Sequence, residues 1–109
     1  MDKTELRNEL YETLLQINQL MAVMTIGSRE YDELWHKQRT LRLQYYDLVS
    51  ASLTDTSQVA DVMHLLGELR RQSQQARDDL NNQIEQFESV AKVLNTVSKV
   101  SSVMADVIR

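Results

Sequence analysis

The chain has 109 residues, which is enough for one compact domain and too few for two. Sixteen acidic and twelve basic residues give a net charge of -4, and there are no cysteines, no prolines and only two glycines. These counts exclude a disulfide framework, a thiolate metal site, a cysteine nucleophile and a glycine-rich phosphate loop. A hydrophobic share of 42% is sufficient for a core, so we expect residues 1–109 to form a single folded domain.

The N-terminal residues 1–9 lack the basic start and the apolar run of a secretory signal. No uncharged apolar stretch approaches the ~18 residues of a membrane span, so we expect a soluble, cytoplasmic protein and no membrane partner. Nucleic-acid binding is not expected either, because no predicted segment has a net positive charge. The arginines stand among acidic residues and predict a solvated, salt-bridged face; they are Arg39, Arg42, Arg70, Arg71 and Arg77.

The first predicted helix covers about residues 2–25. Its apolar residues recur at spacings of three and four, which places them on one helix face. They are Leu6, Leu10, Leu14, Ile17, Met21 and Met24. Gly27 suits the left-handed position after a helix end, and Ser28 is suited to cap the next helix through its side-chain oxygen.

The second predicted helix covers about residues 29–52 and carries most of the aromatic residues. Tyr31, Trp35 and Tyr45 share an arc with leucines, so we expect them in the core, with Trp35 as an anchor between helices. The alternative is a recognition surface, since Trp and Tyr dominate binding hot spots. Tyr46 lies about 60° round the helix from Tyr31 and is the candidate exposed aromatic.

The remainder of the chain predicts one long helix over about residues 56–108, beginning after a capping-box pattern of Asp55 and Gln58. A spacing of four and three continues to Ile108, as in a coiled-coil seam. We therefore expect an all-α fold in which an antiparallel hairpin of the first two helices packs on this helix. Short connections would make consecutive helices neighbours. The alternative is a compact four-helix bundle with a turn near residues 73–78.

A wide apolar face marks the C-terminal segment and is the candidate surface for self-association or partner binding. Its residues are Phe87, Val90, Val93, Leu94, Val97, Val100, Val103, Met104, Val107 and Ile108. A second copy of the chain, the first two helices after a turn, or another protein or membrane could cover it. A membrane is the weakest choice, because only Lys92 and Lys99 flank the face.

Two motifs resemble the metal-binding units of helical bundles, Glu33-x-x-His36 and Asp61-x-x-His64. On a helical wheel both histidines fall on polar faces, so we expect solvated histidines and no metal. No Ser/His/acid set can be assembled from inward-facing positions. We therefore expect no cofactor and no enzymatic activity.

These observations favour a non-enzymatic helical protein-protein interaction module, an adaptor. It would form a homodimer through its C-terminal amphipathic helix and bind another protein. The alternative is a small helical chaperone or inhibitor that captures a partner's helix on the apolar face of residues 90–108.

Overall fold

The computed structural model describes residues 3–50, 56–82 and 87–108, and every regular element within these ranges is an α-helix, with an isolated bridge residue at Ile108. The helices are α1 (Lys3–Val23), α2 (Arg29–Asp47), α3 (Thr56–Asn81) and α4 (Phe87–Val107). The expected all-α class is confirmed. The molecule is elongated along its helices, with extents of 43 × 22 × 18 Å.

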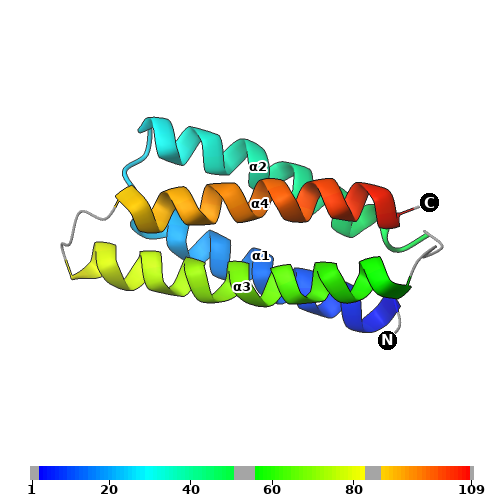
Figure 1. The fold of residues 1–109 in the computed structure, drawn as a ribbon. Helices are drawn as coiled ribbons and strands as arrows, with labels where there is room; N and C mark the ends of the chain where they lie inside the picture. The colour runs from blue at the N-terminus through cyan, green and yellow to red at the C-terminus, as the bar shows by residue number, and fades with distance from the viewer. Residues whose placement is uncertain (1–2, 51–55, 83–86, 109) are drawn as a thin grey trace.

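The four helices form a bundle in which each helix has two neighbours (Figure 1). The helices α1 and α3 run side by side in the same direction, and Arg70 of α3 pairs with Glu9 of α1 at 3.0 Å. The helices α2 and α4 run in the opposite direction, and the Gln44 side chain donates to the Ser101 carbonyl at 3.0 Å. The pairs α1–α2 and α3–α4 are antiparallel and complete the bundle.

The single long helix over residues 56–108 is therefore wrong, and the alternative four-helix bundle is the observed architecture. The break between α3 and α4 lies after Asn81 and not at residues 73–78, where α3 is unbroken. The polar stretch of α3 stays helical because its residues are mostly good helix formers. The Asn82 amide still donates to the Asp78 carbonyl at 3.0 Å, so helical bonding extends to that point.

The predicted contact between α2 and α3 is also wrong, because these helices lie on a diagonal of the bundle. Both direct their apolar faces at the common core. Leu34 and Leu41 of α2 are fully buried, as are Leu66 and Leu69 of α3. Which helices are in contact is therefore determined by the burial of all four apolar faces in one core, and not by the order of the helices in the chain.

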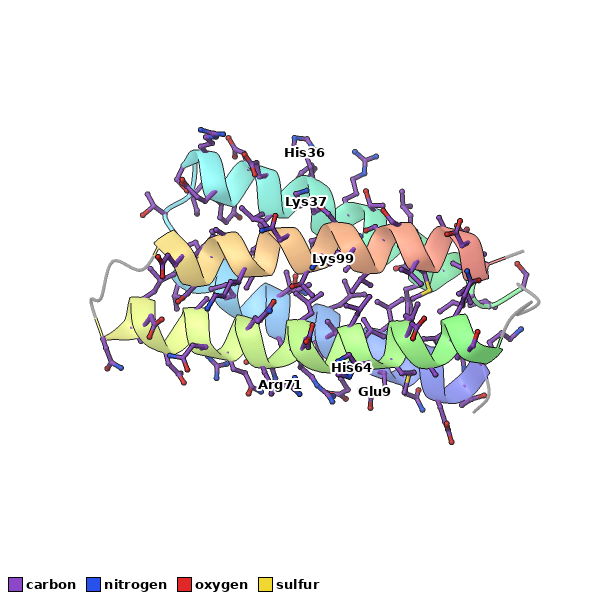
Figure 2. The ribbon with its side chains drawn as sticks, viewed as in Figure 1. Glu9, His36, Lys37, His64, Arg71 and Lys99 are labelled. Carbon is purple, nitrogen blue, oxygen red and sulfur yellow. The ribbon has the colours of Figure 1, made fainter. Side chains whose placement is uncertain are left out.

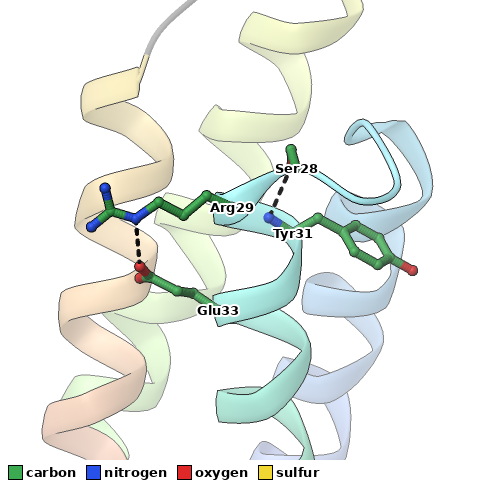
Figure 3. Close-up of polar contacts among 4 residues, drawn as sticks. All are labelled: Ser28, Arg29, Tyr31 and Glu33. Atoms are coloured by element: carbon green, nitrogen blue, oxygen red, sulfur yellow. Dashed lines mark hydrogen bonds and ion pairs between the residues drawn. The ribbon is translucent and has the colours of Figure 1, made fainter.

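The connection between α1 and α2 follows its sequence signals (Figure 3). Gly27 has a φ of 88°, a left-handed conformation that disfavours residues with a Cβ. Ser28 is the N-cap of α2, and its hydroxyl accepts a hydrogen bond from the Tyr31 amide at 3.2 Å. Arg29 pairs with Glu33 one turn along the helix at 3.3 Å. The capping box predicted at Asp55 lies outside the described residues.

The C-terminal apolar face packs inside the same chain. Six of its residues are buried in the core and three more are partly buried against it. The buried six are Val90, Val93, Val97, Val100, Met104 and Val107, and the other three are Leu94, Val103 and Ile108. The side chain of Phe87 lies outside the described residues. The surface expected to bind a second copy or a partner is therefore part of the core, which corrects that assignment.

Candidate functional site: the aromatic groove between α1 and α2

The exposed large hydrophobic residues gather on one side of the bundle. Within the described residues, every one of them lies on α1, on α2, or in the segments directly following these helices. They are Tyr11, Leu15, Val23, Ile26, Trp35, Leu43, Tyr46 and Val49. Single exposed apolar residues are ordinary, whereas a contiguous apolar patch marks an interaction site.

A hollow of about 480 Å³ lies between α1 and α2 on this side, and we call it the aromatic groove. The helices α1 and α2 pack less closely against each other than α3 and α4 do, which leaves room between them. Residues of both helices and of the connecting loop line the groove. They are Tyr11, Leu14, Leu15, Asn18, Met21, Ala22, Ile26, Tyr31, Trp35, Gln38, Arg42, Tyr45 and Tyr46.

The buried lining residues of the aromatic groove join it to the core. Leu14 and Met21 belong to the hydrophobic core, so their side chains have defined positions. Gln38 is only 6% exposed, and its side-chain amide donates to the Asn18 Oδ1 atom at 3.0 Å. This bond links α2 to α1 within the groove. The floor of the groove is therefore formed by packed and hydrogen-bonded residues of the two helices.

Tyrosines form one end of the aromatic groove. The rings of Tyr11 and Tyr45 face each other across the two helices, with their centroids 6.0 Å apart. Tyr46 packs edge-on against Tyr45 with a centroid distance of 5.7 Å. Tyr46 is the aromatic residue that the sequence singled out for exposure, and it is 61% exposed. The three rings form a continuous aromatic surface with polar hydroxyl tips.

Trp35 stands nearer the other end of the aromatic groove, beside Tyr31 and Ile26 in the lining. The expectation that Trp35 anchors the core is wrong, because 41% of the residue is exposed. Its ring contacts His36 edge-on with centroids 5.2 Å apart, and the core position beside it belongs to Leu34. Tyr31 and Tyr45 pack partly against the core, as expected. The alternative interpretation of these aromatics as a surface set fits Trp35 and Tyr46.

Arg42 gives the aromatic groove its charge. Among the described lining residues it is the one that carries a charge, and none of them is a carboxylate. Within the described part of the chain, Arg42 forms no ion pair, and its residue is exposed. The groove therefore presents a cation among uncharged residues that are mostly apolar or aromatic, in a chain whose net charge is -4.

The two candidate metal-binding units do not meet. Figure 2 shows His36 on α2 and His64 on α3, at opposite sides of the bundle. Both residues are exposed, and His64 lies 3.6 Å from Glu68 of its own helix. Among the described residues no three His, Asp or Glu side chains gather in a group able to hold a metal ion. The two units are consistent with solvated surface residues.

The arginines of α3 mostly contact neighbouring helices rather than the acidic residues next to them in the sequence. Arg70 pairs with Glu9, and Arg77 donates to the Gln19 side chain, so both contact α1. Arg71 is exposed and lines a smaller hollow of about 250 Å³ together with Lys92 of α4. These basic groups are distributed along the helices and do not form one continuous patch with Arg42.

Tyr46 and Trp35 were identified from the sequence, but the residues of α1 that form the opposite wall were not. Tyr11 and Leu15 lie just outside the regular apolar spacing of α1, and this displacement toward α2 was the available signal.

No family model, no curated protein and no solved structure matches the chain. No helix within the described residues combines the length and apolarity needed to cross a membrane.

Proposed function

We propose that the chain is a non-enzymatic protein-protein interaction module that binds an amphipathic helix of another protein in the aromatic groove. The observation that carries this proposal is that five of the eight exposed large apolar residues line one groove between α1 and α2. Trp and Tyr supply much of the energy at protein interfaces, because they bury large surfaces at a small cost in conformational entropy. Trp35, Tyr11 and Tyr46 are placed to do so.

The shape of the aromatic groove suits a helix. Its lining on α2 extends from Tyr31 to Tyr46, which corresponds to about 22 Å at 1.5 Å per residue. A helix of about four turns has this length. Binding of an amphipathic helix between two others is a recurrent mode of recognition, in which apolar residues on one helix face enter the groove. The partner helix would then be a fifth helix, packed against the four-helix bundle in the aromatic groove.

A second copy of the chain is a less suitable occupant. A symmetric dimer brings the same surface of both copies together, so two concave grooves would face each other. Arg42 would also meet the like charge of its symmetry mate. The homodimer was expected to form through the C-terminal face, but residues of this face are buried in the core of the chain itself. These points favour a different protein as the partner.

The proposal can be tested with Trp35 as the reporter, since it is the only tryptophan in the chain. The probe is a neutral 18-residue helical peptide with leucines at positions i, i+3, i+8 and i+11 and glutamines at i+4 and i+7. We expect a saturable change of Trp35 emission, because the peptide replaces water around a partly exposed indole. A peptide of the same composition with its leucines spread round the helix should leave the emission unchanged.

Two variants locate the binding site of this peptide. Tyr46→Ala removes an aromatic ring from the groove and should weaken binding. Leu43→Ala removes an exposed side chain of the same helix outside the lining and should leave the affinity unchanged. Absence of any saturable change would contradict the proposal, and equal effects of both variants would do so too. A dimer in sedimentation that dissociates in Tyr46→Ala would instead identify a second copy as the occupant.

A further inference from the structure

We propose that the partner helix carries a carboxylate side chain between two apolar residues, and that this carboxylate binds Arg42. This inference rests on the proposed function and concerns the chemistry of the helix that the aromatic groove accepts. It follows from the order of three lining residues along α2, which are Trp35, Arg42 and Tyr46.

These three residues lie nearly on one line along the helix. Arg42 follows Trp35 by seven residues, and Tyr46 follows it by eleven. At 100° per residue these steps return to within about 20° of the direction of Trp35. At 1.5 Å per residue, Arg42 and Tyr46 lie about 10 Å and 16 Å along α2 from Trp35. The groove therefore presents an indole, a guanidinium and a phenol in succession.

Among the described residues, the cation in the middle has no anion beside it. Within residues 3–50, 56–82 and 87–108, no carboxylate lines the groove and Arg42 forms no ion pair. Arg29 and Arg70, in contrast, each pair with a glutamate. A helix that covered Arg42 with apolar side chains alone would remove its water without replacing those hydrogen bonds, which is unfavourable. A carboxylate can accept two parallel N–H bonds from the guanidinium.

The lining of the groove holds a second side-chain N–H donor, on α1. The Asn18 Oδ1 atom accepts the bond from Gln38, and the Asn18 side chain also carries an NH₂ group. Asn18 belongs to the same lining as Arg42, on the opposite wall. Arg42 and the Asn18 side chain thus both offer N–H donors to a ligand in the groove. An acceptor with several lone pairs, such as a carboxylate, matches them better than a second amide or an ammonium group.

The spacing of these groups defines the pattern of the partner helix. A helix parallel to α2 would place apolar residues at i and i+11 and the carboxylate at i+7. A helix in the opposite direction would place the carboxylate at i+4, because the order is reversed. In both cases the three side chains share one helix face. Peptides with glutamate at both i+4 and i+7 satisfy either direction.

The test compares three peptides that share the leucine pattern given above. The first is the neutral peptide with glutamines at i+4 and i+7. The second has glutamates at these two positions. The third keeps the glutamines there and has glutamates at i+2 and i+9, on the opposite helix face. The second and third peptides have the same net charge, so repulsion by the net charge of -4 affects both alike.

We expect the second peptide to bind roughly threefold to fivefold more tightly than the third in titrations of Trp35 fluorescence, as for a partly exposed ion pair. Arg42→Gln should abolish this difference. Arg39→Gln removes the same charge from α2 outside the groove lining and should preserve the difference. Raising the salt concentration should reduce the preference, because salt screens a partly exposed ion pair.

The outcomes separate this inference from the proposed function. If the second and third peptides bind equally well, or if Arg42→Gln leaves their difference intact, the carboxylate inference is wrong while the groove still binds helices. If none of the three peptides binds, the proposed function itself is contradicted. A preference that disappears equally in Arg39→Gln and Arg42→Gln would show general attraction to α2 and would overturn the assignment to Arg42.

Discussion

At the scale of single residues, the helical wheel predicts the direction of a side chain better than its burial. Leu34 and Trp35 are adjacent and both belong to the apolar arc of α2, yet Leu34 is fully buried and Trp35 is partly exposed. The arc is wider than the part of α2 that its neighbours cover, so residues at its edge remain accessible. The width of the apolar arc can be read from the sequence, but the part of that arc that neighbouring helices bury cannot.

This difference predicts opposite consequences for two neighbouring substitutions. Leu34→Ala should lower the free energy of unfolding by about 3 kcal/mol, because it removes a fully buried side chain and leaves a cavity. Trp35→Ala should cost only about 1–2 kcal/mol, since much of the ring already contacts water. Urea denaturation of both variants, followed by circular dichroism, measures these values. A larger cost for Trp35→Ala would place this residue in the core.

A buried hydroxyl group allows a second prediction at this scale. Ser73 of α3 is fully buried, and its Oγ atom has no hydrogen-bond partner in the described chain. Ser73→Ala should therefore stabilise the protein by about 1 kcal/mol, because an unpaired buried hydroxyl is costly. Thr13→Val provides the comparison, since the Thr13 hydroxyl donates to the Glu9 carbonyl at 2.7 Å. Thr13→Val should give no gain in thermal denaturation. Equal effects would contradict the argument.

At the scale of elements, two helix boundaries follow from local chemistry and a third does not. The end of α1 and the start of α2 coincide with Gly27 and Ser28, whose backbone and side chain act as predicted. The end of α3 has no glycine or proline beside it, and the pair Asn81-Asn82 is only a weak signal against helix. The position of this break depends on how far α4 must fold back to bury its apolar face.

The continuity of α3 through its polar stretch gives an element-scale prediction. Gln74 is exposed and lies inside α3, seven residues before its end. Gln74→Pro should lower the free energy of unfolding by about 3 kcal/mol, because proline removes a backbone donor and clashes with the preceding turn. Gln74→Ala keeps the helix and should be neutral or slightly stabilising. Thermal denaturation compares them, and a harmless proline would indicate a turn at this position.

At the scale of the whole molecule, closure of the bundle decides which apolar surface remains free. The sequence shows two apolar sets, the valine-rich C-terminal face and the aromatic residues of α2, and composition alone does not rank them. Nine residues of the C-terminal face can fill the core because α4 returns along α3. Once the core is filled, Trp35 and Tyr46 remain outside. The site could therefore be predicted by residue type, but its location required the packing of all four helices.

The position of Val97 at the centre of α4 allows the intramolecular packing to be tested against self-association. Val97 is fully buried, so Val97→Glu places an unpaired carboxylate in the core, where burial costs several kcal/mol. A domain of this size has a free energy of unfolding of about 5–15 kcal/mol. We therefore expect the variant to lose most of its helical circular dichroism and its cooperative melting. If the face were instead a dimer seam, the chain would stay helical and become monomeric.

The matched control is Ser102→Glu, which introduces the same side chain at an exposed position of α4. This variant should keep the helical content and the melting transition of the parent protein, because its carboxylate remains in water. Sedimentation at several concentrations distinguishes the alternatives for both variants. If the Val97→Glu chain is folded and monomeric while the parent protein is a dimer, the C-terminal face is a self-association surface after all. Unfolding of Val97→Glu alone would place Val97 in the core, with the aromatic groove as the surface left for partners.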